Sequence, residues 1–252
     1  MIEIIAAIIV FIIGTLLGSF CTLAVYRIPI KQDITHERSY CPKCKHKLGF
    51  LDLIPVLSYI FLGGKCRYCK EKIRPIYLIL EIMSGITFLA YVLSLHINIY
   101  NIQLGDIVEI FFGMIYICIF AITAGIDLEN RKIEKGIIAT TGITSIIYIL
   151  YLYILGVNMY RYVIYFMIII CLLVIDKAKP SYTLDIINYM LLILLYVGTD
   201  VMLLIIAITF IAIALKNIVN MIITKKEFKP AIGAIFSIVS ICVLIIQNFI
   251  TV

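Results

Sequence analysis

The sequence predicts an all-α polytopic membrane protein with about eight transmembrane helices, and three observations lead to this prediction. Of the 252 residues, 63% are hydrophobic and only 14% are charged, which excludes an ordinary soluble globule. Apolar stretches near the length that crosses a bilayer recur along the whole chain. One long polar loop, residues 27–75, interrupts them. The predicted organisation is a first transmembrane helix at 1–26, this loop, and a seven-helix membrane domain at 76–252.

Each predicted transmembrane helix depends on an apolar stretch of about 20 residues. The eight candidates, of which the fifth and sixth are short, lie near 4–26, 76–96, 107–126, 137–155, 160–175, 183–198, 201–223 and 232–250. The first contains Glu3 and has no Lys or Arg before Arg27, which favours a retained helix over a signal peptide. Gly14 and Gly18 form a small-xxx-small pair that suits close approach of another helix.

The distribution of basic residues predicts the orientation, because Lys and Arg accumulate in cytoplasmic loops. The loop 27–75 carries eleven of the 21 basic residues. Further basic groups at 131–135, 177–179 and 216–229 fall on the same side if eight spans alternate, and only Arg161 falls on the other. We therefore expect a protein of the cytoplasmic membrane with both termini outside the cytoplasm. This topology and contact with an anionic lipid bilayer explain the net charge of +6, so nucleic-acid binding is not required.

Two Cys-x-x-Cys pairs lie in the polar loop, separated by 21 residues: Cys41 with Cys44, and Cys66 with Cys69. Two such pairs at this separation are typical of a tetrahedral zinc site with two thiolates from each pair. Four thiolates leave no open position, so the zinc is expected to be structural. Because the loop has too few apolar residues to form a core, metal binding would supply much of its folding free energy. The alternative is four free or disulfide-paired cysteines.

Two other features concern the loop and its connection to the second span. Residues 53–62 are an apolar stretch between the cysteine pairs, with Pro55 near its start, and this pattern favours an interfacial segment against the membrane. Glu81 lies about one turn inside the second span. Arg74 is near enough in sequence to form an interfacial ion pair with it.

Two carboxylates are predicted to lie at one depth on the cytoplasmic side of the membrane. Asp127 closes the third span and Asp185 opens the sixth. If they meet, like-charge repulsion at low dielectric prevents both from ionising together, and the pair would share a proton as in an aspartic protease. Alternatively, both simply face water at helix ends. Asp176, which ends the fifth span beside Lys177, is a rival for the role of Asp185.

The sequence resembles the type IV prepilin peptidases, a family of membrane aspartic proteases, most densely in its first third. The matching stretches include a GSF…YRxP segment and the family's zinc-binding loop, here Gly18–Phe20 with Tyr26, Arg27 and Pro29, then Cys41–His46, Ile54–Tyr59 and Gly64–Cys69. Ile126-Asp127 is similar to the family's Ile-Asp at its first catalytic aspartate. The family's Gly-x-Gly-Asp-x-Lys reads Tyr182-Thr183-Leu184-Asp185-Ile186-Ile187 here, which keeps the aspartate but neither glycine nor lysine.

The resemblance implies an aspartic endopeptidase that cleaves the basic leader peptide of type IV prepilins or pseudopilins at the cytoplasmic membrane face. It implies that Asp127 and Asp185 are catalytic and that the four cysteines bind Zn²⁺. Many members also N-methylate the new N-terminus with S-adenosylmethionine, a second activity that the resemblance extends to this chain. The missing glycines bear on catalytic geometry, because glycine lets a backbone approach its substrate closely. Neither the particular pilin nor the oligomeric state is predicted.

Two other function classes fit parts of the sequence. A catalytically degenerate, zinc-stapled scaffold that binds pilin or assembly proteins agrees with the loss of the glycines around Asp185. A transporter or channel explains the carboxylates but not the zinc loop, and the broken helices expected at the midplane of a transporter are not apparent in the sequence.

Overall fold

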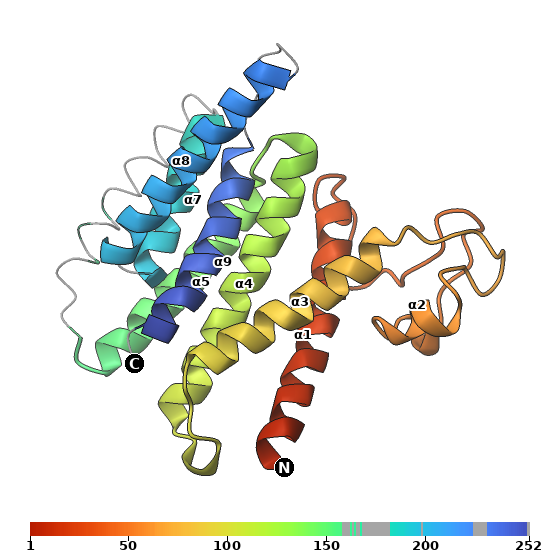
Figure 1. The fold of residues 1–252 in the computed structure, drawn as a ribbon, viewed down its shortest axis with the longest axis horizontal. Helices are drawn as coiled ribbons and strands as arrows, with labels where there is room; N and C mark the ends of the chain where they lie inside the picture. Colours follow the sequence, from red (N-terminus) through yellow and green to blue (C-terminus); the bar gives the residue numbers. More distant parts are fainter. Residues whose placement is uncertain are drawn as a thin grey trace. The chain divides into compact units, whose positions relative to one another are not determined.

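The structure is a computed structural model that describes residues 1–157, 182–197, 199–223 and 231–250, with three isolated positions at 162, 164 and 167. All named elements in these residues are helices, shown in Figure 1. In chain order they are α1 (Ile2–Arg27), η1 (Phe50–Asp52), α2 (Leu57–Phe61), α3 (Ile76–Ser94), η2 (Ile99–Asn101), α4 (Leu104–Asn130), α5 (Lys135–Ile154), α7 (Tyr182–Val197), α8 (Thr199–Ile223) and α9 (Ile232–Ile250). The prediction of an all-α fold is confirmed.

Seven of the eight predicted spans coincide with helices in the part of the chain that the structure describes. Among the described residues, five helices are long and apolar enough to cross a membrane: α1, α3, α4, α5 and α9. The sixth predicted span, expected to be short, is α7 with 16 residues. The fifth predicted span, 160–175, lies outside the described residues apart from three positions. Asp176 and Lys177 also lie outside the described residues.

The helices fall into two compact units, residues 1–110 and the residues from Phe111 on, and the division lies inside α4. The first unit is built on the packing of α1 against α3. A Cβ on Gly14 would lie 2.9 Å from the Cα of Gly85, and one on Gly18 would overlap the side chain of Ser84. The Ser84 hydroxyl donates a hydrogen bond of 2.9 Å to the Gly14 carbonyl. The small-xxx-small pair is therefore a close helix contact.

Gly18→Leu is expected to lower the stability of the protein, because the new side chain would have to occupy the space of Ser84 on α3. Overpacking of this kind typically costs about 1–3 kcal/mol. The midpoint of thermal unfolding in detergent measures the effect. Leu16→Phe is the matched control on the same helix, since the Leu16 side chain is 50% exposed. Equal midpoints for the two variants would contradict the close contact.

The second unit contains α5, α7, α8, α9 and the larger part of α4. Buried hydroxyl groups join its helices. The Ser145 hydroxyl on α5 donates to the Leu192 carbonyl on α7 over 3.0 Å and lies 2.7 Å from the Tyr116 hydroxyl on α4. The ring of Tyr196 stacks on that of Tyr116 with centroids 3.9 Å apart. In Figure 1, α4 ends at the end of this unit where α7 and α9 begin.

Candidate functional site

The two cysteine pairs of the first unit sit in two loops with the same backbone pattern. In the first, Cys41 N–H donates to the His46 carbonyl, and in the second, Cys66 N–H donates to the Glu71 carbonyl. The residue after each pair has a positive φ, 58° at Lys45 and 59° at Lys70. The isolated bridges Tyr40↔Lys47 and Lys65↔Lys72 also occupy equivalent positions. The sequence signal for this repeat, Cys-x-x-Cys-Lys-x-Lys, is visible twice but was not recognised in the sequence analysis.

The four thiols of these loops converge on one point. The Sγ atoms of Cys41, Cys44, Cys66 and Cys69 all lie within 4.8 Å of one another, and those of Cys41 and Cys69 are 3.9 Å apart. Zinc bound to four thiolates at about 2.3 Å separates the sulfur atoms by roughly 3.8 Å in a regular tetrahedron. The cluster therefore fits a metal ion such as zinc, and all four cysteines are free of disulfides.

The protonation of the cluster differs from thiol to thiol. The backbone N–H groups of Cys44 and Lys43 stabilise the Cys41 thiolate against the opposing effect of burial, and lower its pKa to about 7. At Cys69 the N–H of Glu71 acts in the same direction, but burial and the other three thiols outweigh it and raise the pKa to about 11. Burial and the hydrogen bonds of the other three thiols thus disfavour the charged form of Cys69. A divalent cation would supply the compensating charge.

The Arg27 side chain holds the first residues of the loop against the end of α1. The Arg27 guanidinium is buried and donates hydrogen bonds to the carbonyls of Asp33, Glu37 and Arg38 at 2.7, 2.9 and 3.4 Å. This contact folds residues 28–38 back against the last turn of α1. The sequence analysis placed Arg27 at the end of the first span and in the YRxP segment, but its buried role needed the structure.

Glu81 on α3 holds the start of α2. Its Oε2 accepts a hydrogen bond of 2.8 Å from the backbone N–H of Val56, whereas the sequence favoured an ion pair with Arg74. Val56 has a φ of 63°, a left-handed conformation in which a β-branched residue is strained, typically by about 1–3 kcal/mol. The Glu81 hydrogen bond supports this strained turn and ties the loop to a membrane-spanning helix.

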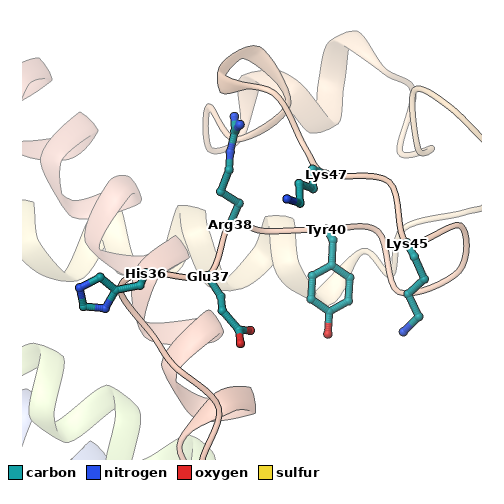
Figure 2. A pocket seen from close by; sticks show the side chains of 6 residues that line it. All are labelled: His36, Glu37, Arg38, Tyr40, Lys45 and Lys47. Atoms are coloured by element: carbon teal, nitrogen blue, oxygen red, sulfur yellow. The ribbon is translucent and has the colours of Figure 1, made fainter.

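An open hollow of about 600 Å³ lies beside the first cysteine pair, drawn in Figure 2. Most of the side chains that line it are basic or aromatic: His36, Glu37, Arg38, Tyr40, Lys45 and Lys47. Figure 2 shows Tyr40 and Lys45 directed to one side and Arg38 to the other. The Nζ of Lys45 lies 5.2 Å from the centre of the Tyr40 ring. A second hollow of about 330 Å³ includes Lys65 and Lys72 at the equivalent places of the second pair.

In the second unit, Asp127 lies in the last turn of α4 and is fully buried. Its Oδ2 accepts a hydrogen bond of 2.9 Å from the backbone N–H of Ala234 in the first turn of α9. The absence of a side chain at Gly233 makes room for this contact, because a Cβ there would lie 3.2 Å from the same oxygen. A carboxylate at a helix N-terminus is stabilised by the free amide groups and the helix dipole. The sequence analysis did not identify α9 as a partner of Asp127.

Asp185, on α7, is also buried. It lies in the first turn of that helix and is 8% exposed. One turn further on, the Tyr189 hydroxyl lies 2.9 Å from the Ser237 hydroxyl of α9 and interacts with Thr123 and the charge of Asp127. Both aspartates are therefore buried at one end of the second unit, in the last turn of α4 and the first turn of α7. Their burial is at odds with the alternative in which they face water.

A second buried polar residue lies close to Asp185 along α7. Asn188 is fully buried, and among the described residues neither its amide nitrogen nor its amide oxygen has a hydrogen-bond partner. An unsatisfied buried amide typically costs about 1–3 kcal/mol, so its position beside Asp185 is a candidate contact for a substrate or a water molecule. Nothing in the sequence pattern distinguished this asparagine.

Comparison with known proteins finds similarity mainly in the first unit. Residues 12–95 match the family model described as the Bacterial Peptidase A24 N-terminal domain. Relatives named "Prepilin leader peptidase/N-methyltransferase" include those of Vibrio cholerae, with 44% identity over 28% of this chain and 31% of the relative, and of Bacillus subtilis, with 34% identity over 52% and 49%. The protein of that name from Klebsiella pneumoniae is 27% identical over 50% of this chain and 54% of its own length.

The extent of these matches is limited. The chain spans about a third to a half of the length of these curated relatives. No solved structure matches it. The matched N-terminal segment includes most of α1, the four-cysteine cluster and α3. The similarity of this segment is therefore to the Bacterial Peptidase A24 N-terminal domain and to proteins named prepilin leader peptidase/N-methyltransferase.

Proposed function

We propose that this chain is a membrane aspartic endopeptidase that removes the basic leader peptide from type IV prepilins or pseudopilins. The observation that carries the proposal is the burial of Asp127 and Asp185 at one end of the second unit. The relatives' names supply the substrate class, since they are prepilin leader peptidases. The concentration of basic residues in the loop 28–75 supports cleavage at the cytoplasmic membrane face with both termini outside.

In the proposed mechanism, Asp127 and Asp185 meet and hold one proton between them, because two adjacent carboxylates in a low dielectric do not both ionise. The ionised member takes a proton from water, and the protonated member polarises the carbonyl of the scissile peptide bond. The Ala234 N–H orients the Asp127 carboxylate. Tyr189, one turn after Asp185 on α7, and Ser237 form a buried hydroxyl pair near Asp127.

The four cysteines are proposed to hold a structural Zn²⁺ ion. Bound there, the ion would neutralise thiolate charge and cross-link the two cysteine loops, which have little apolar core of their own. S-adenosylmethionine-dependent methylation of the new N-terminus is proposed as a second activity, and the relatives' full names support it.

The test is direct cleavage by the purified, zinc-loaded chain in lipid nanodiscs. The substrate is a synthetic prepilin with a basic leader followed by an apolar helix, and mass spectrometry identifies the products. We expect a single cut just before the apolar helix. With S-adenosylmethionine present, the mature product should gain the mass of one methyl group. Cleavage that stays absent at high enzyme concentration would refute the peptidase.

A scaffold that binds pilin or assembly proteins without cutting them is the second candidate. It is favoured by one observation, the replacement of Gly-x-Gly before Asp185 by Tyr182-Thr183-Leu184. The same nanodiscs separate the two functions. A scaffold would retain labelled prepilin with a measurable dissociation constant and return it intact, whereas the peptidase releases the leader.

A further inference from the structure

The loop between α1 and α3 carries an exposed apolar surface that its own fold does not use. Phe50 is 81% exposed and Phe61 is 83% exposed. Between them, four more large apolar side chains are 43–65% exposed, and we call the six together the apolar island: Phe50, Leu51, Leu53, Leu57, Ile60 and Phe61. A group of large exposed apolar side chains in a short segment is a candidate site of contact with a partner or a membrane.

Membrane spanning does not explain the apolar island. Its helical parts are η1, with three residues, and α2, with five. At 1.5 Å per residue, α2 is only about 7.5 Å long, a small fraction of the ~30 Å hydrocarbon core. The exposed side chains of α1 and α3 belong to helices long enough to cross the bilayer, but those of η1 and α2 do not.

Glu81 places the apolar island at the level of a membrane-spanning helix. Glu81 follows the first residue of α3 by five positions, which corresponds to about 7.5 Å along the helix axis. Its carboxylate binds the backbone N–H of Val56, the residue that begins α2. Figure 1 draws α2 to the side of the beginning of α3, without extending past the upper end of α1.

The residues on both sides of the apolar island are basic. The first cysteine loop contributes Lys43, Lys45 and Lys47, and the second contributes Lys65, Lys70 and Lys72, whereas Arg67 forms an ion pair with Asp52. Two hollows with lysines in their walls open beside these loops. An apolar surface flanked by lysines is complementary to an anionic bilayer. The apolar side chains contact acyl chains, and the lysines contact the negative headgroups.

We propose that the apolar island inserts into the surface of an anionic bilayer and anchors the cysteine-rich loop there. The Glu81 hydrogen bond sets the depth of insertion, because it ties the start of α2 to the second turn of α3. The strained turn at Val56 directs the backbone N–H of this residue to the Glu81 carboxylate. The anchor does not depend on the proposed peptidase activity.

Depth-dependent fluorescence quenching tests the anchor, and the chain suits the experiment because it contains no tryptophan. Phe61→Trp introduces a single probe at an 83% exposed position of the island. Lys43→Trp is the matched control, at an exposed position between Cys41 and Cys44. Both full-length, zinc-loaded variants are placed in nanodiscs that contain phosphatidylglycerol, with lipids brominated along the acyl chain as quenchers.

We expect quenching of the Phe61→Trp probe to exceed that of the Lys43→Trp probe by at least about threefold, since an interfacial segment lies about 5–10 Å into the headgroup and acyl boundary. Adding Glu81→Ala to the Phe61→Trp protein should reduce the quenching while zinc content stays unchanged. Replacing phosphatidylglycerol by neutral lipid should also reduce it. Equal quenching at positions 61 and 43 would overturn the proposal.

The apolar helix of a prepilin is the other partner that could cover the apolar island. The same two tryptophan probes distinguish this partner from the bilayer. In that case, the Phe61→Trp probe is not quenched by lipid alone. Its emission shifts to shorter wavelength only when a synthetic apolar pilin helix is added. This outcome would overturn the membrane anchor and assign the apolar island to substrate docking.

Discussion

Asp127→Asn is expected to reduce leader cleavage by about 10²- to 10⁴-fold, the usual effect of removing a general acid or base. The amide keeps the size of the carboxylate and can still accept the Ala234 hydrogen bond. It cannot take a proton from water, so the chemistry fails while the packing against α9 remains. Initial rates of cleavage of a synthetic prepilin in nanodiscs measure the activity. The midpoint of thermal unfolding, measured in parallel, shows whether the fold is kept.

Glu129→Gln is the matched control, because Glu129 lies two residues further along the same helix end and is exposed. Its cleavage rate should equal that of the unmodified chain. Asp185→Asn should reproduce the loss seen for Asp127→Asn. Asp176→Asn, outside the described residues, should retain activity. Full activity of Asp127→Asn, or loss of activity in Asp176→Asn but not in Asp185→Asn, would show that the proposed pair is wrong.

Cys41→Ser is expected to abolish tight zinc binding and to unfold the loop between α1 and α3. The unmodified chain should contain one zinc ion, held by the four thiols that lie within 4.8 Å of one another. Because structural zinc sites contribute on the order of 10 kcal/mol to the folding of small domains, the loss leaves residues 28–75 largely open to proteases. Zinc content by atomic emission and the rate of limited proteolysis measure the effect.

Cys242→Ser controls for the general effect of removing a thiol. Cys242 is an exposed cysteine of α9 outside the four-cysteine cluster. The substitution should leave zinc content and proteolysis unchanged, and Cys66→Ser should behave like Cys41→Ser. A chain that keeps one zinc ion after either cluster substitution would contradict four-thiolate coordination. A chain without zinc whose loop is equally resistant would contradict the structural role.

The bounds of the helices could be predicted because the bilayer sets length and apolarity for each helix separately. The expected spans 137–155 and 232–250 correspond to α5 (Lys135–Ile154) and α9 (Ile232–Ile250). The largest differences occur where polar residues continue a helix beyond its apolar part. The third span was predicted at 107–126, but α4 extends to Asn130. Asp127 therefore lies within the last turn instead of after it.

The spacing of the cysteines was sufficient to predict the metal cluster, because two Cys-x-x-Cys pairs encode their geometry within a few residues. Close packing at Gly14 and Gly18 was also visible as a local pattern, although the partner, Ser84 and Gly85 on α3, was not. Contacts across long sequence separations left no such signal. Glu81 with Val56 and Asp127 with Ala234 are joined only by the folded chain.

The sequence by itself determined an all-α membrane protein, the positions of seven described helices and the four-cysteine cluster, since each follows from short-range spacing or composition. The tertiary structure alone decided that Asp127 is held by the first turn of α9, that Asn188 is buried next to Asp185, and that Glu81 ties α2 to α3. The physical reason is that a hydrogen bond between residues 25 or 107 positions apart depends on how helices pack, and no local pattern records that packing.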